Sequence, residues 1–170
     1  MVVDLLNYGA AAQKAFGYNT SDLANNKLTA QQAAMATQSA EASDSRVSGE
    51  NYLGTQLRLE SQIMLRMAFN NVDQNMYAII SFTNHSGREC EIFVDGSEFE
   101  MTGEVAAITI DDIVVADGRM PVTVTVYGPD DQVVASATDS MESYIARMSE
   151  SDELFLQILK FSDSAYRYFH

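Results

Sequence analysis

The sequence predicts an α+β fold, with an antiparallel β-sandwich-like core of about seven strands and N- and C-terminal helices packed together. Apolar residues recur at helical spacing near both ends of the chain. Between these ends, short runs alternate between apolar and polar residues and are rich in β-branched and aromatic side chains. Parallel strands would need helices between them, so these closely spaced strands are predicted to be antiparallel.

Residues 1–36 are predicted to be helical. The first helix spans 2–16, and Gly17 is suited to end it because glycine readily adopts the left-handed conformation of a C-cap. Its predicted apolar stripe consists of Leu5, Tyr8, Ala12 and Phe16. Thr29 is a suitable N-cap for a second helix over 30–36. Residues 37–51 are small and polar without periodicity, which predicts a loop.

The β core is predicted to occupy residues 52–138. Its predicted strands lie near residues 57–59, 63–69, 77–83, 90–94, 104–110, 122–127 and 133–138. The last two strands form the clearest hairpin, since Gly128-Pro129-Asp130-Asp131 is typical turn chemistry.

Helices return at 140–169, where Ser140 is suited to cap a helix over 141–148 and Ser151 or Asp152 a final helix from Glu153. Residues 6–16 align without gaps on residues 159–169. Both segments carry small residues that would allow close helix packing: Gly9, Ala12, Ser162 and Ala165. We therefore expect the terminal helices to pair, so that residues 1–170 form a single domain with its ends close together.

The formal net charge of −14 excludes several classes of partner. An acidic surface repels phosphate backbones and anionic lipid headgroups, so we expect no nucleic-acid partner. No apolar run reaches the length of a membrane span, so we expect no membrane insertion. Met1 is followed directly by an apolar helical pattern with no capping residue before it. We interpret the chain as a fragment of a larger protein whose export signal is not in this sequence.

The opening segment resembles a known module. Leu5-Leu6-Asn7-Tyr8-Gly9-Ala10-Ala11-Ala12-Gln13, then Phe16-Gly17-Tyr18-Asn19-Thr20 and Leu23-Ala24-Asn25, is similar to the start of an accessory module near the carboxyl ends of large secreted proteins of Gram-positive gut anaerobes. Tyr52-Leu53-Gly54 and the closing segment 159–169 follow in the family's order, although Phe161-Ser162 stands where the family has Tyr-Gly. The resemblance implies an extracellular or cell-surface accessory role beside other domains of a parent protein, and it implies no catalytic residues.

The sequence offers little catalytic chemistry. The only histidines are His85 and His170, and neither has a sequence neighbour that suggests a catalytic triad. Zinc-ligand spacing and phosphate-binding glycine motifs are absent. Paired carboxylates remain a distant alternative, because a glycoside hydrolase needs only two. No cofactor is expected, apart from calcium at three weak candidate ligands: Asp111, Asp112 and Asp117.

Glycan binding needs aromatic faces with hydrogen-bonding neighbours. Tyr127 is predicted to share one strand face with Thr123 and Thr125, and Tyr52 is a fourth candidate. Further rings that could bind a sugar or fill the core are Tyr77, Phe82, Phe93 and Phe99. We expect a non-catalytic extracellular module that binds a polysaccharide or cell-wall glycan or acts as a structural spacer. A protein–protein assembly module is the alternative, ahead of the glycoside hydrolase.

Overall fold

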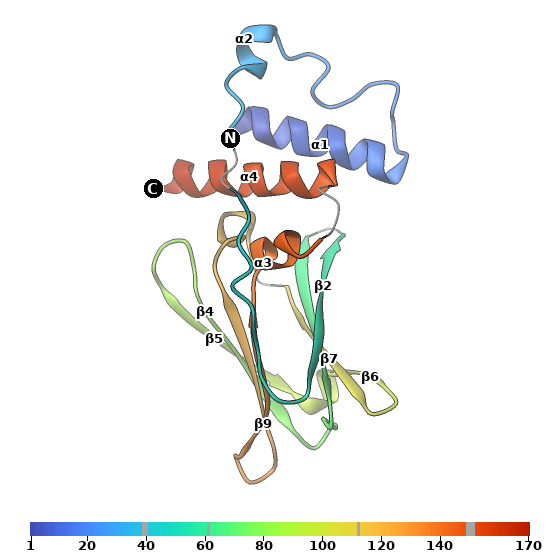
Figure 1. Ribbon diagram of the computed structural model, residues 1–170, viewed down its shortest axis with the longest axis vertical. Coiled ribbons are helices and arrows are strands. Elements are labelled where there is room, and N and C mark those ends of the chain that lie inside the picture. The colour runs from blue at the N-terminus through green and yellow to red at the C-terminus, as the bar shows by residue number, and fades with distance from the viewer. Residues whose placement is uncertain (39–40, 61, 112, 149–151) are drawn as a thin grey trace.

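The computed structural model describes residues 1–38, 41–60, 62–111, 113–148 and 152–170. It contains two antiparallel β-sheets that face each other and a layer of helices at one end of them (Figure 1). The predicted α+β class with a sandwich-like antiparallel core is therefore confirmed.

One sheet has five strands, and all of its pairs are antiparallel. Their spatial order is β1 (Val47–Ser48), β9 (Val133–Asp139), β8 (Val122–Tyr127), β4 (Tyr77–Thr83) and β5 (Glu89–Asp95). The predicted hairpin is formed by β8 and β9. Strand β5 is an edge strand, and no other strand of the described residues pairs with its outer side.

The second sheet has four strands and is also antiparallel. Its order is β2 (Tyr52–Leu59), β3 (Ile63–Asn70), β7 (Val105–Ile110) and β6 (Glu100–Thr102). Two strands in the described part, β1 and β6, go beyond the predicted set. They span only two and three residues, which is too short for an alternating pattern to show in the sequence.

The core lies between the sheets because alternate residues of each strand point inward. On β8, Val122, Val124 and Val126 are buried, and the residues between them are partly exposed. Strand β3 contributes Leu65, Met67 and Phe69 from the other sheet, each at most 1% exposed. Burying each of these side chains contributes about 1.5–3 kcal/mol.

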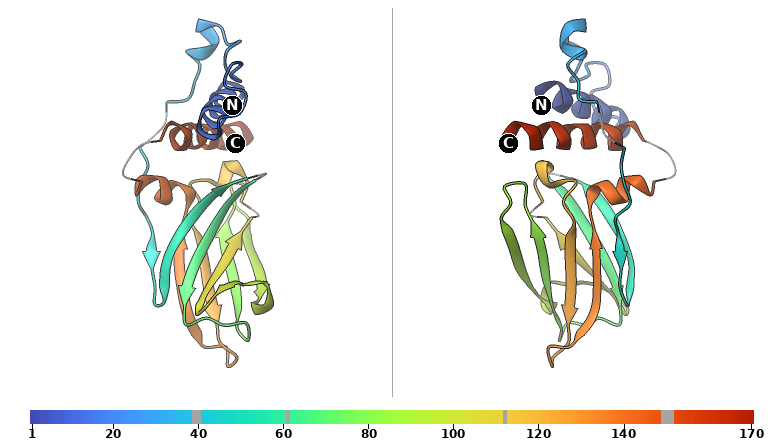
Figure 2. Two further views of the ribbon diagram at one scale, coloured as in Figure 1. Left: turned by 90° about the vertical axis from the view of Figure 1, so that its right-hand side faces the viewer. Right: turned by 60° about the vertical axis from the view of Figure 1, so that its left-hand side comes forward.

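Helices α1 (Val2–Phe16) and α4 (Glu153–Phe169) pack against each other above the end of the sandwich (Figure 1). The rings of Tyr8 and Phe161 stack between them, with centroids 6.1 Å apart. The helices run antiparallel, and the two ends of the chain lie close together (Figure 2). The predicted pairing of the terminal helices is thus confirmed.

The predicted stripe of α1 is wrong in part. Leu5 and Phe16 are 44% and 64% exposed, whereas Asp4 is 1% exposed. The Asp4 carboxylate accepts hydrogen bonds from the Thr37 backbone N–H (2.7 Å) and hydroxyl (3.2 Å). These bonds satisfy a buried charge, so the helix turns its Asp4 side inward and leaves apolar residues in solvent.

Two of the small residues do not lie at the helix contact as predicted. A Cβ on Gly9 would meet Ala24, and a Cβ on Gly118 would lie 2.6 Å from Ser162 Oγ. Gly9 therefore packs under the turn that follows α1. Ser162 faces the segment that follows the short helix η2 (Val115–Asp117).

Helices α2 (Ala30–Ala33) and α3 (Met141–Ala146) are shorter than predicted, and the short helix η1 (Gly96–Glu98) was not predicted. Residues 41–51 were predicted to form a loop, but they run alongside α3 and β9 and contact both. Ser45 N–H donates to Ser143 Oγ (2.8 Å), β1 pairs with β9, and Asn51 Nδ2 donates to the Val134 carbonyl (2.8 Å). These partners are distant in the sequence, so local composition could not predict them.

Candidate functional site

The outer face of the five-stranded sheet carries the residues that the sequence grouped together. Thr123, Thr125 and Tyr127 alternate with the buried valines of β8, so all three point away from the core. Thr123 Oγ1 lies 2.8 Å from Thr138 Oγ1 of β9, and Thr125 Oγ1 lies 3.4 Å from Ser136 Oγ. These cross-strand pairs place a patch of hydroxyl groups beside Tyr127.

Three aromatic rings cross this face in a row, which we call the aromatic row: Phe93, Tyr77 and Tyr127. Tyr77 is directly opposite Tyr127 in the β4–β8 register, and their ring centroids lie 5.1 Å apart with an interplanar angle of 14°. On the other side, Tyr77 stacks with Phe93 at 5.3 Å and 25°. Phe93 lies on the edge strand β5 and is 63% exposed. One end of the row is therefore open to solvent.

The centre of the row is held by a hydrogen bond. The Tyr77 hydroxyl donates to Asp131 Oδ1 at 2.9 Å, and Asp131 belongs to the turn between β8 and β9. This bond to a carboxylate raises the pKa of Tyr77, so the phenol stays protonated. The ring orientation is thus fixed by contacts on both sides and at the hydroxyl.

The exposed charges that the strands of this sheet carry are acidic. Glu89, Glu91 and Asp95 are exposed on the outer side of β5. The five strands of the sheet contain no lysine and no arginine. A ligand at the aromatic row would therefore meet negative charge from the protein and no strand-borne cation.

Tyr52 does not belong to this surface. It lies on β2 in the other sheet, where its ring packs against Phe69 with centroids 5.8 Å apart. Its hydroxyl contacts Thr55 Oγ1 (2.6 Å) and Asp139 Oδ2 (3.3 Å). Burial raises the pKa of Tyr52. The structure therefore gives Tyr52 a packing role and separates it from Tyr127.

Two other candidate rings fill the core, because Phe82 and Phe99 are only 8% and 4% exposed. Tyr77 and Phe93, by contrast, stand beside Tyr127. Sequence reasoning placed them only among further rings, since their position depends on β4 lying between β5 and β8.

The calcium candidates are not gathered into one site among the described residues. Asp117 is buried, and its Oδ1 accepts the His85 backbone N–H (2.6 Å) and lies 2.8 Å from His85 Nδ1. Asp111 is exposed, and Asp112 falls outside the described residues. The part of the chain that the structure describes holds no cluster of three or more His, Cys, Asp or Glu side chains suited to a metal ion.

The His85–Asp117 contact gives His85 the acidic partner that the sequence did not reveal. A catalytic triad would also need a nucleophile hydrogen-bonded to the other ring nitrogen. Within the described ranges, Asp117 is the only hydrogen-bond partner of the His85 ring. The pair instead ties the β4–β5 loop to η2.

Two glutamates that were candidates for the paired carboxylates of a glycoside hydrolase, Glu98 and Glu100, are engaged in other contacts. Glu100 accepts hydrogen bonds from Arg66 Nε (2.9 Å) and Thr109 Oγ1 (3.0 Å). Burial opposes its charge, but these bonds outweigh burial and lower the pKa of Glu100. A general acid needs a raised pKa. Glu98 Oε1 accepts the Asp95 backbone N–H and caps η1.

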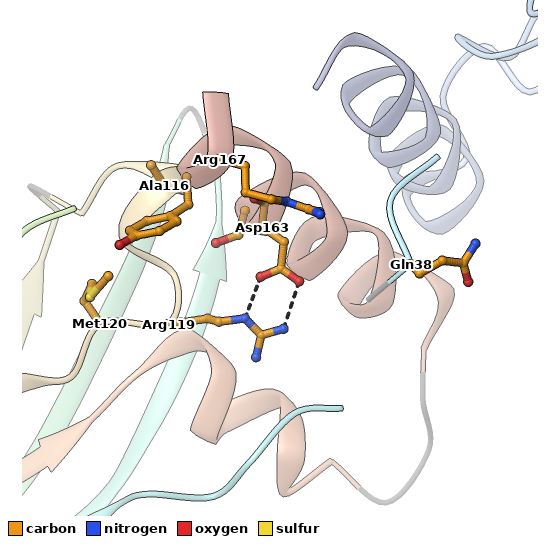
Figure 3. Close-up of a pocket in the computed structure, with 8 residues that line it drawn as sticks. Gln38, Ala116, Arg119, Met120, Asp163 and Arg167 are labelled. Atoms are coloured by element: carbon orange, nitrogen blue, oxygen red, sulfur yellow. Dashed lines mark hydrogen bonds and ion pairs between the residues drawn. The ribbon is translucent and has the colours of Figure 1, made fainter. Parts of the chain in front are cut away.

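A hollow lies between α4 and the segment around η2, away from the aromatic row (Figure 3). Its volume is about 300 Å³, and its walls include Ala116, Met120 and Tyr166. Arg119 forms one side, where Nε and Nη2 donate to Asp163 at 2.5 and 2.9 Å. Arg119 also pairs with Glu142. The bonds to Asp163 contribute most to raising the pKa of Arg119, which stays charged.

Comparison with known proteins gives no further assignment. No protein-family model matches the chain, and no curated protein matches it. Within the described residues, no helix is long and apolar enough to cross a bilayer. The resemblance to secreted accessory modules stays a prediction.

Proposed function

We propose that the protein is a non-catalytic extracellular accessory module that binds a neutral glycan on the outer face of its five-stranded sheet. The observation that supports this most is the aromatic row. Sugar rings pack their C–H faces on aromatic side chains and use their hydroxyl groups for hydrogen bonds. The row offers rings of fixed orientation, and the hydroxyls of Thr123, Thr125 and Ser136 lie beside it.

The acidic surroundings favour a neutral ligand over an anionic one. Glu89, Glu91 and Asp95 surround Phe93 along β5, and Asp131 adjoins Tyr77. These charges would repel uronate or phosphate groups on a polymer. The extracellular and parent-protein parts of the proposal rest on the resemblance of residues 5–25 to secreted modules.

Affinity gel electrophoresis tests the proposal. Gels would contain a neutral β-glucan, a neutral mannan, a neutral xylan or polygalacturonate as an anionic polymer. We expect retardation in at least one neutral gel and none in polygalacturonate. Phe93→Ala and Tyr127→Ala should each reduce the retardation, because each removes a ring of the row. Tyr18→Ala is the matched control, because Tyr18 is 75% exposed and follows α1 instead of lying on the sheet.

Three outcomes would refute glycan binding at this face. The first is no retardation by any neutral polymer. The second is retardation that the ring substitutions leave unchanged. The third is an equal loss of retardation in Tyr18→Ala, which would indicate a general surface effect.

An assembly role is the second candidate, because α1 exposes apolar side chains. Val2, Leu5 and Phe16 are 63%, 44% and 64% exposed. Exposed apolar residues that gather on one element are typical of protein contacts. Assembly predicts a mass above that of the monomer in light scattering, and Leu5→Glu should return it to the monomer value. A monomer at high concentration would favour the glycan-binding module or a spacer.

A further inference from the structure

The hollow under α4 has the features of a small-molecule site that is separate from the glycan face. Its volume of about 300 Å³ is at the lower end of the range for ligand pockets. Ala116 and Met120 come from the η2 segment (Figure 3). Tyr166 comes from the last turns of α4. Together they give the hollow an apolar wall.

One polar group in the wall has no partner. Ser162 is 1% exposed and lines the hollow, yet its hydroxyl makes no hydrogen bond within the described ranges. Gly118 packs closely against one side of this residue, because a Cβ there would lie 2.1 Å from Met141 Cε and 2.6 Å from Ser162 Oγ. The residue lines the hollow, so its hydroxyl is available to donate a hydrogen bond to a ligand atom there.

The two arginines that line the hollow differ in whether a carboxylate neutralises their charge. Arg119 is bound by Asp163 and Glu142. Arg167 donates Nε to the Asp163 backbone carbonyl (3.2 Å) and Nη2 to Thr37 Oγ1 (3.1 Å), and both acceptors are uncharged. No carboxylate among the described residues pairs with Arg167. A guanidinium has five N–H donors, so Arg167 keeps donors for a carboxylate ligand.

We propose that this hollow binds a small monocarboxylate with a planar apolar body. The carboxylate pairs with the Arg167 guanidinium and accepts a hydrogen bond from Ser162. The apolar body packs on the Tyr166 ring and on Met120. The ion pair is the source of selectivity, because a neutral ligand of the same shape leaves Arg167 without a counter-ion.

The test uses 3-phenylpropionate as probe and its neutral analogue 3-phenylpropanamide as comparison. Binding is followed by ¹H–¹⁵N correlation spectra of the whole chain at pH 7. A probe of this size is expected to bind with roughly millimolar affinity. Shifts should concentrate in residues 116–120 and 162–167. The amide should bind about tenfold more weakly, since it lacks the charge that pairs with Arg167.

Two variants and a matched control separate this site from nonspecific charge effects. Arg167→Gln should weaken 3-phenylpropionate binding about tenfold, and it should fold normally because Arg167 is exposed. Ser162→Ala should weaken binding by a smaller factor. Lys160→Gln removes a cation from the same helix outside the hollow and should change nothing. Equal binding of acid and amide, unchanged affinity in Arg167→Gln, shifts elsewhere, or no shifts up to about 10 mM probe would overturn the proposal.

Discussion

Removing Arg147 should reveal how the helical end is joined to the sheets. Asp139 ends β9, and its side chain is fully buried. Its carboxylate accepts two hydrogen bonds from Arg147, at 2.6 Å from Nη2 and 3.0 Å from Nη1. Ser140 N–H donates to it at 2.9 Å, and the Tyr52 hydroxyl lies 3.3 Å away. In Arg147→Met the carboxylate keeps only the two weaker contacts.

The stability lost in Arg147→Met can be estimated from the burial of Asp139. Breaking a buried ion pair by removing one partner costs about 3–5 kcal/mol, because an uncompensated charge is left behind. Arg147 keeps 18% of its side chain in solvent, so we expect the lower end, about 3 kcal/mol. In a domain of this size, that corresponds to a fall in Tm of roughly 6–12 °C.

Urea unfolding followed by circular dichroism measures the change in free energy of unfolding. Arg58→Met is the matched control, because its pair with Glu100 spans 3.8 Å between side chains 37% and 46% exposed. The control should cost less than about 1 kcal/mol. Arg147→Met combined with Asp139→Asn should recover part of the loss, since no buried charge remains. A cost for Arg147→Met no larger than the control's would refute the reasoning.

Three further predictions concern other parts of the molecule. Burial raises the pKa of Asp4, but bonds from Thr37, Ser164 and the Met1 ammonium outweigh it and lower the pKa overall. The stability that ionised Asp4 contributes is therefore present above about pH 4 and is lost as the pH falls through the lowered pKa of the folded state. Asp4→Asn should remove this contribution, so that Tm falls less steeply with decreasing pH than in the parent protein. Gly96→Ala places a Cβ 2.3 Å from the Met76 carbonyl oxygen and should cost about 2 kcal/mol in urea unfolding. Tyr77→Phe keeps the stacked ring and should retain glycan retardation in affinity gels.

Each of these has a result that would contradict it. For Asp4→Asn, it is a Tm that falls as steeply with decreasing pH as in the parent protein. For Gly96→Ala it is an unchanged free energy of unfolding, which would mean that the backbone moves aside freely. For Tyr77→Phe it is a loss of retardation as large as that of Phe93→Ala, which would assign binding to the hydroxyl instead of the ring.

Local patterns predicted most of the fold. Alternation in segments such as 122–127 is imposed by burial of one strand face, so it can be read directly from the residues. Helix ends were similarly local, because Gly17 takes a left-handed φ of 66° and Ser140 caps α3 with its own side chain. The orientation of α1 could not be read in this way. Its buried face is set by Asp4 and Thr37, which are separated by 33 positions in the chain.

The candidate site was predictable only along one strand. Tyr127, Thr123 and Thr125 share a face through the strand period alone. The aromatic row also requires that β4 pairs with both β5 and β8, in registers that place Tyr77 directly opposite Tyr127 and diagonally across from Phe93. Such strand pairings depend on the whole sheet, so the sequence could identify the candidate rings but could not predict that they lie side by side.

The most direct test of the account is a map of where a neutral glycan touches the protein. The ¹⁵N-labelled chain would be titrated with a soluble fragment of whichever neutral polysaccharide retards it. The account predicts amide shifts in residues 77–83, 89–95 and 122–127, and little change in residues 2–16. Shifts confined to the helical end, or a spectrum that no neutral glycan alters, would contradict it.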